Sequence, residues 1–309
     1  SLHAPPSKSH TLRAILFATL AQGTSTITHP LRSPDTDAMI HACQQLGAYI
    51  ERKNNQIIIQ GAGRQLNTPT NDIDAGNSGQ VLRYMAAICA LLDEPVYITG
   101  DDSICQHSPI KPYIESFQQL DARCESVHHN DHAPIIVQGP FKAGTIELNG
   151  EDSQLVTGLL IAASQIHGTT TINVTQAGET PWIDLTLSWL DRLYIPYERD
   201  GYHRYQLTGP ITLSAFDYDI PGDWSSIAFP IVASLITQSP ISISHCDLND
   251  AQGDKAILTI LKDMGANITH DATNNTLHIE RSPTLTGGTW DVNHCIDAIT
   301  ILAVVACYA

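Results

Sequence analysis

Apolar runs of helical length recur along this chain, and a short polar cluster opens each of them. The openings lie roughly 70 to 75 residues apart, a spacing typical of structural repeats. The five openings are Ser7-Lys8-Ser9, Asn77-Ser78-Gly79, Asp152-Ser153-Gln154, Asp223-Trp224-Ser225-Ser226 and Asn293-His294-Cys295-Ile296-Asp297. A helix end followed by a β-rich stretch repeats with the same period, at Leu46-Gly47-Ala48, Leu120-Asp121-Ala122, Leu193-Tyr194-Ile195 and Met264-Gly265-Ala266. Because two markers share one period, the pattern predicts an internal repeat.

The first repeat predicts the order helix, strand, helix, strand, strand. Its first helix ends where Gly23 interrupts the apolar spacing, and its second ends at Gly47. The turn Asn54-Asn55 lies between two β-rich segments and indicates a hairpin. The predicted elements are helices 8–22 and 33–47 and strands 26–28, 49–51 and 57–59.

The same order recurs in the second, third and fourth repeats, and the fifth opening is followed by one helix. Further predicted helices are 81–92, 110–120, 155–166, 183–193, 227–236 and 256–264. Further predicted strands are 96–98, 135–137, 170–174, 195–197, 205–207, 241–243, 267–268 and 277–279, and the joints between units are Gly61, Gly139, Gly209 and Pro283. Alternating helices and strands indicate an α/β or α+β fold with repeats around shared cores, and 309 residues suit two domains.

The composition narrows the classes of function. A formal net charge of -16 leaves no basic face for nucleic acid or an anionic membrane. The seven cysteines form neither a C-x-x-C pair nor a zinc-site spacing, so we expect reduced thiols and no metal. Since the chain shows no signal-peptide pattern and its apolar runs are about half a membrane span long, we expect a cytoplasmic protein that does not enter a membrane.

The polar openings are candidates for chemistry because free backbone N–H groups and the positive end of the helix dipole face outwards there. If the repeats surround a common axis, these ends converge and form an anion site even in an acidic protein. Helix capping alone explains Ser, Asn or Asp at these positions. It does not explain Lys8, which opposes the dipole unless an anion compensates it, nor Arg13 and Arg83, whose planar groups suit carboxylate or phosphate.

Eight motifs, in order and spacing, resemble the 5-enolpyruvylshikimate-3-phosphate (EPSP) synthase family across the whole chain. They are Pro6-Ser7-Lys8-Ser9 with Arg13-Ala14, Asp35-Thr36-Asp37-Ala38-Met39, Gly76-Asn77-Ser78-Gly79 with Arg83, Ser153-Gln154, Pro181-Trp182-Ile183-Asp184, Gly222-Asp223-Trp224-Ser225-Ser226, Gln252-Gly253-Asp254 and Asn293-His294-Cys295-Ile296-Asp297-Ala298. The resemblance implies a two-domain inverse α/β barrel built from βαβαββ units. It also implies one domain of residues 9–213, with three complete units, and another of 1–8 and 214–309 that is incomplete.

The resemblance implies transfer of the enolpyruvyl group of phosphoenolpyruvate to the 5-hydroxyl of shikimate 3-phosphate, with release of phosphate. This is a step of the shikimate pathway, which leads to chorismate and the aromatic amino acids. The reaction passes through a tetrahedral ketal phosphate in a cleft between the domains, needs no cofactor, and uses Lys8 and Asp297 as catalytic residues. Asp297 is the carboxylate placed at the attacking hydroxyl.

The family pattern also assigns the binding residues. Lys8 contacts both substrates, and phosphoenolpyruvate lies beside Asn77 and Gly79. The residues assigned to shikimate 3-phosphate are Ser9, Arg13, Ser153, Gln154 and Asp297. Arg83, His107 and Ser108 are further candidates.

The sequence departs from the family pattern at several positions. Alignment on Pro109-Ile110 places Ser108 where the family has an arginine at phosphoenolpyruvate, and His107 is a poor permanent cation. Glu179 is expected to repel a nearby anion, and Asp152 replaces a serine. The chain starts without methionine and stops inside an apolar run, before the family's basic Lys-Glu-x-x-Arg helix. We therefore expect a fragment with little turnover on its own, and a monomer.

Two alternatives remain open. The sister transferase that acts on UDP-N-acetylglucosamine shares the fold and uses a loop cysteine as an acid, and Cys105 lies in the corresponding loop. A catalytically incomplete or degenerate repeat protein that only binds an anion is the second alternative, favoured by the missing loop arginine. A serine in place of Cys105 separates the two enzymes.

Overall fold

The computed structural model describes all 309 residues and divides them into two compact units. The larger unit is Lys8–Asp219, and the smaller unit combines Ser1–Ser7 with Ile220–Ala309. The predicted domain limits, 1–8 with 214–309 and 9–213, stay a prediction, because compactness alone does not show that a unit folds by itself.

The larger unit contains three four-stranded sheets with one pattern of pairing. In each sheet an incoming strand pairs in parallel with the next strand, which pairs antiparallel with one strand of a hairpin. The sheets are β15(Asp217–Asp219)-β3(Thr24–Thr28)-β5(Gln56–Gln60)-β4(Tyr49–Lys53), β6(Ile73–Asp74)-β7(Val96–Thr99)-β9(Ile135–Gln138)-β8(Arg123–Ser126) and β10(Thr145–Asn149)-β11(Gly168–Thr175)-β13(Arg204–Gly209)-β12(Tyr197–Asp200). Two short strands, β2(Ala21–Gln22) and β14(Leu213–Ser214), form a separate parallel pair.

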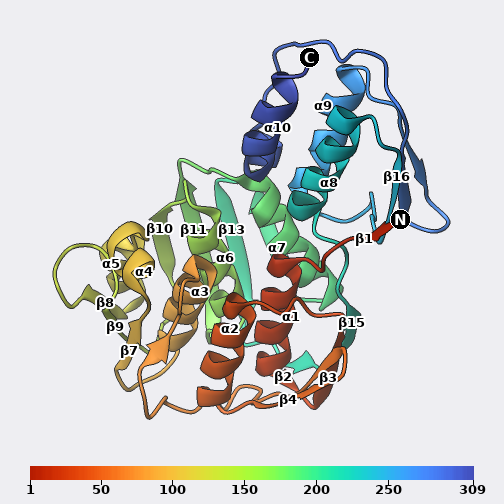
Figure 1. Ribbon diagram of the computed structural model, residues 1–309. Helices are drawn as coiled ribbons and strands as arrows, with labels where there is room; N and C mark the ends of the chain where they lie inside the picture. Colours follow the sequence, from red (N-terminus) through yellow and green to blue (C-terminus); the bar gives the residue numbers. More distant parts are fainter. The chain divides into compact units, whose positions relative to one another are not determined.

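The helices of the larger unit are α1(Lys8–Leu20), α2(Pro34–Gln45), α3(Gly79–Cys89), α4(Asp102–His107), α5(Lys111–Ser116), the 3₁₀-helix η1(Phe117–Leu120), α6(Ser153–Ala163) and α7(Thr180–Arg192). The helices α1, α2, α3, α6 and α7 lie in the middle of the larger unit, whereas the shorter helices α4 and α5 lie at its edge (Figure 1). The first helix of each repeat, α1, α3 or α6, is buried on nearly every side. A helix that is apolar all round belongs in a core, so this burial agrees with the sequence pattern.

The smaller unit repeats the same sheet. Its strands are β1(Leu2–His3), β16(Ile241–Ser244), β18(Thr276–Ile279) and β17(Ile268–Asp271), in that order. Its helices are α8(Trp224–Thr237), η2(Gly253–Ala256), α9(Ile257–Asp263), η3(Asn293–Ala298) and α10(Ile299–Ala306). Trp224 is fully buried in its core, and the indole N–H donates to the carbonyl of Asp247 over 3.1 Å.

The predicted order of elements is confirmed, with three corrections. The loop after the second strand of repeat two contains α4, whose six residues are too few to show a helical period. The predicted helix 110–120 is α5 followed by η1, and helix 256–264 is η2 followed by α9. The incoming strands β1, β6, β10 and β15 were not predicted, because runs of two to five residues carry little periodic signal.

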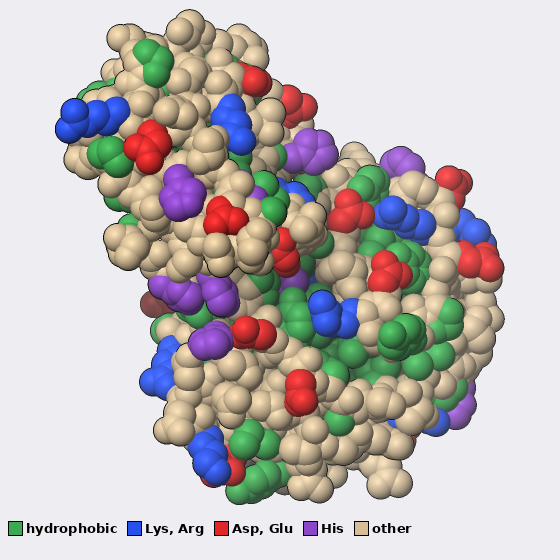
Figure 2. All heavy atoms as spheres, turned by 90° about the vertical axis from the view of Figure 1, so that its right-hand side faces the viewer, with side chains coloured by type: hydrophobic (Ala, Val, Ile, Leu, Met, Phe, Trp, Pro, Cys, Tyr) green, Lys and Arg blue, Asp and Glu red, His purple; other side chains and the backbone are tan.

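Three observations bear on the expectations from composition. All seven cysteines are free, and Cys43, Cys89, Cys124, Cys246 and Cys295 are buried. No helix in the structure is both long enough and apolar enough to cross a bilayer. On the face drawn in Figure 2, the Lys and Arg side chains lie apart from one another, with Asp and Glu among them.

The predicted joints at Gly61, Gly139 and Gly209 have a common steric cause. A Cβ at Gly139 would lie 2.0 Å from the carbonyl oxygen of Ala90, and one at Gly61 would lie 2.1 Å from that of Ala21. A Cβ at Gly209 would lie 2.5 Å from the carbonyl oxygen of Ile166. Each joint glycine therefore lets the chain pass against the end of its repeat's first helix.

Alanine at position 139 is expected to lower the free energy of unfolding of the larger unit by about 2 kcal/mol, because backbone atoms must move to admit the methyl group. Gly287→Ala is the matched control, since a Cβ there meets nothing within 4 Å. Urea unfolding of both variants measures the difference. Equal midpoints would contradict the steric explanation.

Candidate functional site

The polar helix openings of α3 and α6 carry side-chain caps. The Ser78 hydroxyl accepts from the N–H of Val81 over 3.3 Å at the start of α3. The Asp152 carboxylate accepts from the N–H of Gln154 over 2.9 Å at the start of α6. The capping interpretation therefore holds for Ser78 and Asp152, and the neighbouring side chains remain the candidates for binding.

The openings of α1, α3 and α6 lie together. The Gln80 amide, in the first turn of α3, donates to the hydroxyl of Ser9 on α1 over 3.4 Å. Arg83, one turn further along α3, donates from Nη1 to Oε1 of Gln154 on α6 over 3.5 Å. The convergence expected for repeats around a common axis is thus present for three of the five openings, all within the larger unit.

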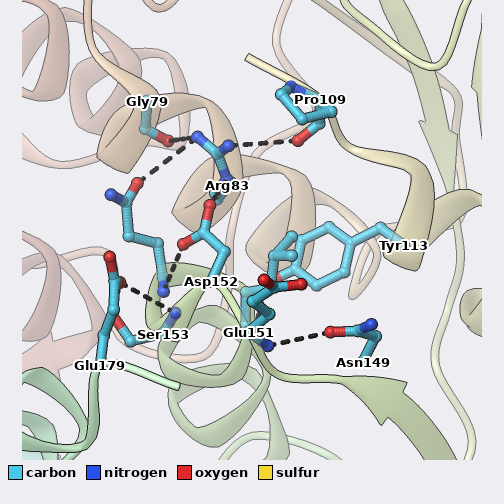
Figure 3. A network of polar contacts seen from close by, with 11 residues as sticks. Gly79, Arg83, Pro109, Tyr113, Asn149, Glu151, Asp152, Ser153 and Glu179 are labelled. Carbon is cyan, nitrogen blue, oxygen red and sulfur yellow. Dashed lines mark hydrogen bonds and ion pairs between the residues drawn. The ribbon is translucent and has the colours of Figure 1, made fainter. Parts of the chain in front are cut away.

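Arg83 is the centre of this cluster (Figure 3). Its side chain is 7% exposed, and its Nη1 also donates to the carbonyl of Gly79 over 3.2 Å. Its Nη2 donates to the carbonyl of Pro109 over 3.1 Å. Nε lies 2.8 Å from Oδ2 of Asp152 in an ion pair that is too poorly aligned to count as a hydrogen bond. Arg83 therefore links the openings of α3 and α6 to the loop that follows α4.

A side chain at position 79 would crowd this guanidinium. A Cβ at Gly79 would lie 2.6 Å from Nη1 of Arg83 and 3.4 Å from Oε1 of Gln154. In this structure the group that lies close to Gly79 is the guanidinium of Arg83, from the same helix.

Arg13 lies among protein partners in the core of the larger unit. The residue is 1% exposed, and burial lowers the pKa of its guanidinium. Nε donates to the hydroxyl of Thr186 over 3.0 Å, and Nη1 to the carbonyl of Ser9 over 3.1 Å. Nη2 donates to Thr157 and to the carbonyl of Trp182 over 3.5 and 3.2 Å. Arg13 thereby fixes α1 against α6 and α7, and its contact with substrate stays a prediction.

Lys8 is the first residue of α1, and its side chain is 47% exposed. Its Nζ lies 3.8 Å from Oδ1 of Asp35 in the first turn of α2. This separation is longer than a hydrogen bond and the lysine side chain is half-exposed, so the pair contributes a modest attraction. In the sequence Asp35 belongs to a family motif and has no assigned role, and its place beside Lys8 makes it a further residue of the candidate site.

Glu179 does not face the site as an uncompensated charge. Its carboxylate accepts from both the N–H and the hydroxyl of Ser153, over 3.3 and 2.8 Å. Glu179 has φ 47°, a left-handed conformation, immediately before α7. The expected repulsion is therefore reduced by hydrogen bonds, and the hydroxyl proton of Ser153 is directed to Glu179.

The remaining candidates of the larger unit lie at its surface. Asn77 is exposed and precedes the cap of α3, and His107 is exposed at the end of α4. Ser108 is half-buried and follows α4 directly. No basic side chain from residues 100–110 is present in this loop apart from His107, as the sequence indicated.

Three aspartates of the smaller unit interact electrostatically. Asp223 caps α8 by accepting from the N–H of Ser226 over 2.9 Å, and Asp297 is exposed in η3. Asp254, in η2, is only 5% exposed. Burial, followed by the charges of Asp297 and Asp223, raises the pKa of Asp254 to about 7, although its own backbone N–H opposes this. In the sequence, Asp254 belongs to the motif Gln252-Gly253-Asp254 and has no assigned role.

Asp35, Asp152 and Asp254 are candidate site residues to which the sequence assigned no role. Asp152 was treated as a departure from a serine pattern, and its partner Arg83 lies in another repeat, about 70 residues away. Asp254 differs from other aspartates only by its burial, which one sequence does not show. For Asp152, the signal available in the sequence is an arginine and a carboxylate at equivalent places in successive repeats.

The whole chain, residues 1–309, matches the family model described as EPSP synthase (3-phosphoshikimate 1-carboxyvinyltransferase). A protein of that name from Chlamydia caviae is 41% identical over 311 residues, which cover 100% of this chain and 69% of the relative. One from Acetivibrio thermocellus is 35% identical and covers 100% of this chain and 72% of the relative. The solved EPSP synthase of Acinetobacter baumannii superposes with a TM-score of 0.83 at 25% identity, over 99% of this chain and 70% of that one. The chain belongs to the EPSP synthase family.

Proposed function

We propose that this chain transfers the enolpyruvyl group of phosphoenolpyruvate to the 5-hydroxyl of shikimate 3-phosphate and releases phosphate. The observation that carries the proposal beyond family membership is the meeting of three helix openings in the larger unit, where Gln80 of α3 contacts α1 and Arg83 of α3 contacts α6. In a chain of net charge -16, a local gathering of helix N-termini and cationic side chains suits anionic substrates. Both proposed substrates are anions.

Lys8 is proposed to supply the charge that both substrates contact. Its half-exposed ammonium group lies at the positive end of α1, where an anion removes the unfavourable interaction with the dipole. Asp35, on α2, attracts Lys8 without reaching hydrogen-bond distance. The pair is therefore suited to exchange part of its interaction for one with a bound phosphate or carboxylate.

Arg83 is proposed to take over part of the task of the missing loop arginine. Its Nη2 donates to the carbonyl of Pro109, which follows Ser108, the position aligned with that arginine. The guanidinium thus brings permanent positive charge to the backbone of this loop. His107, at the end of α4, does not provide permanent charge.

Asp297 is proposed to remove the proton of the attacking hydroxyl. The oxygen then bonds to C2 of phosphoenolpyruvate while the methylene carbon gains a proton, which gives the tetrahedral ketal phosphate. In the second step the bond to phosphate breaks and the new methyl group loses a proton, so the enol ether is restored. Asn77, Gly79, Ser9, Ser153 and Gln154 are proposed to bind the substrates, and each belongs to the cluster of helix openings or borders it.

The test is phosphate release from phosphoenolpyruvate in the presence and absence of shikimate 3-phosphate, together with calorimetry of shikimate 3-phosphate binding. Lys8→Ala is expected to lower kcat/KM by about 100-fold, since one charged donor at a developing anion contributes roughly that much. Lys53→Ala removes an exposed lysine of the same unit and is the control. Equal binding and turnover in the two variants would refute the role of Lys8. The same assay measures whether turnover is as low as the sequence led us to expect.

The sister transferase is not favoured by the family match. Cys105, its candidate acid, is half-buried and its thiol donates to the carbonyl of Gly100 over 3.4 Å. Serine at this position is expected to leave the rate of phosphate release within about twofold of that of the parent protein. Cys105 takes no part in the proposed reaction, and such a cysteine acts only as a small packing group. Loss of turnover in Cys105→Ser would revive the alternative.

Several finer expectations stay predictions: a monomer, a cytoplasmic location, no metal or cofactor, and no nucleic-acid partner. Seven free cysteines support a reducing compartment. Sedimentation analysis with and without the two substrates tests the oligomeric state.

A further inference from the structure

Asp254 is a buried carboxyl group that lacks a complete set of partners. The residue is 5% exposed, and its Oδ1 is buried without a hydrogen-bond partner. The adjacent Lys255 does not compensate it, because its Nζ donates to the carbonyls of Leu248 and Asp250, over 3.0 and 2.5 Å. An ionised carboxylate in this setting has a high free energy, and protonation lowers it.

The elements packed against η2 add negative rather than positive charge. From η3 come Asp297 and the buried thiol of Cys295, while His294 of the same element is exposed. From the opening of α8 comes Asp223, and the rest of α8 carries no titratable side chain. The titratable side chains of α9 are Lys262 and Asp263, both exposed in its last turn. No cation therefore faces Asp254 from these elements.

We propose that Asp254 is a positioning residue that holds a proton in mildly acidic solution, releases it as the pH rises past neutrality, and thereby sets the proton affinity of Asp297. Among three interacting carboxyl groups the last ionisation is the most costly, and the most buried group retains its proton longest. Asp223 is the least suited to do so, because its ionised oxygens accept from the N–H of Ser226 and from the hydroxyl of Ser225. Asp297 is exposed, so water stabilises its charge.

The inference rests on the proposed role of Asp297 as the base. While Asp254 is neutral, it places no negative charge beside Asp297, the proposed acceptor of the hydroxyl proton. When Asp254 loses its proton, near pH 7, a second negative charge appears beside Asp297. That charge raises the proton affinity of Asp297 and opposes the approach of anionic substrates. The pH dependence of the reaction above neutrality therefore reports on Asp254.

The direct test is carbon-13 NMR of the aspartate carboxyl groups in the whole chain, recorded from about pH 3 to pH 9. We expect Asp254 to titrate near pH 7 and Asp297→Asn to lower that value by half a unit or more, roughly the effect of one nearby charge. In Asp254→Asn, which keeps the shape of the protonated side chain, Asp297 is expected to lose the later part of its two-step titration. Asp263→Asn removes an exposed charge of the same unit and is expected to change neither titration.

Two results would overturn the inference: titration of Asp254 in the usual range below about pH 5, or a titration of Asp297 that Asp254→Asn leaves unchanged. Turnover gives the second readout. The value of kcat/KM is expected to fall above pH 7 in the parent protein and to stay level in Asp254→Asn, whereas a purely structural role would leave the two profiles parallel. Absence of turnover in the parent protein would refute the proposed function, and the titrations, which need no turnover, would still decide the role of Asp254.

Discussion

Asparagine in place of Asp254 is expected to raise the free energy of unfolding of the smaller unit by up to about 4 kcal/mol above pH 7. In the folded protein the pKa of Asp254 is about 7, raised from 3.8 by burial and by the neighbouring carboxylates. Below about pH 3.8 both states bind the proton and the carboxyl group has no net effect. Between these values the unfolded state releases its proton first, so stability falls as pH rises, and above pH 7 the full penalty is present. The amide carries no such penalty.

The measurement is unfolding in urea at about pH 4 and pH 8, followed by hydrogen exchange of amides in α8 and α9 so that the smaller unit is observed separately. Asp254→Asn is expected to gain stability at pH 8 and little at pH 4, whereas Asp263→Asn is expected to gain little at either. A gain of equal size at both pH values would show that packing, and not the proton, causes it.

The positions of the helices and hairpins followed from the sequence because their signals are local. The apolar spacing of α1, the caps at Ser33 and Ser78 and the joint glycines each act within a few residues. The closing strand β15 is different, since it joins a sheet whose other strands lie at 24–60. Three residues carry no pattern that names such a distant partner.

The candidate site, like the fold, was predicted only where its signals are local. Repeated polar openings indicated correctly that helix N-termini converge, and they did so for α1, α3 and α6. What each charged side chain contacts was not predictable, because the identity of a partner depends on packing between repeats. Arg13 and Arg83 occupy similar places in their repeats. Arg13 nevertheless donates hydrogen bonds to hydroxyls and carbonyls, whereas Arg83 pairs with an aspartate and donates to a loop carbonyl.

The contacts of Arg83 make it the side chain whose loss is expected to disturb the larger unit most. Arg83→Met keeps the aliphatic length but leaves the carbonyl of Pro109 and the carboxylate of Asp152 without their cation. Removing one partner of a mostly buried pair costs about 3 kcal/mol or more, and the 32% exposure of the Asp152 side chain favours the lower end. Urea unfolding followed by exchange in α3 and α6 measures this loss. Arg123→Met removes an exposed arginine paired with Glu125 and is the control, with an expected change below about 1 kcal/mol.

A double-variant cycle separates the charge of Arg83 from its other bonds. Asp152→Asn keeps an oxygen for the α6 cap, so the variant Arg83→Met/Asp152→Asn no longer contains an unpaired carboxylate. It is expected to recover about 1 to 2 kcal/mol of the loss seen in Arg83→Met. Additive effects would mean that Asp152 finds enough water to do without its partner, and that Arg83 stabilises the unit through Gly79, Gln154 and Pro109 alone. In that case the charge of Arg83 would be more fully available to an anion. This result would support its proposed role at the loop and would reduce its structural role.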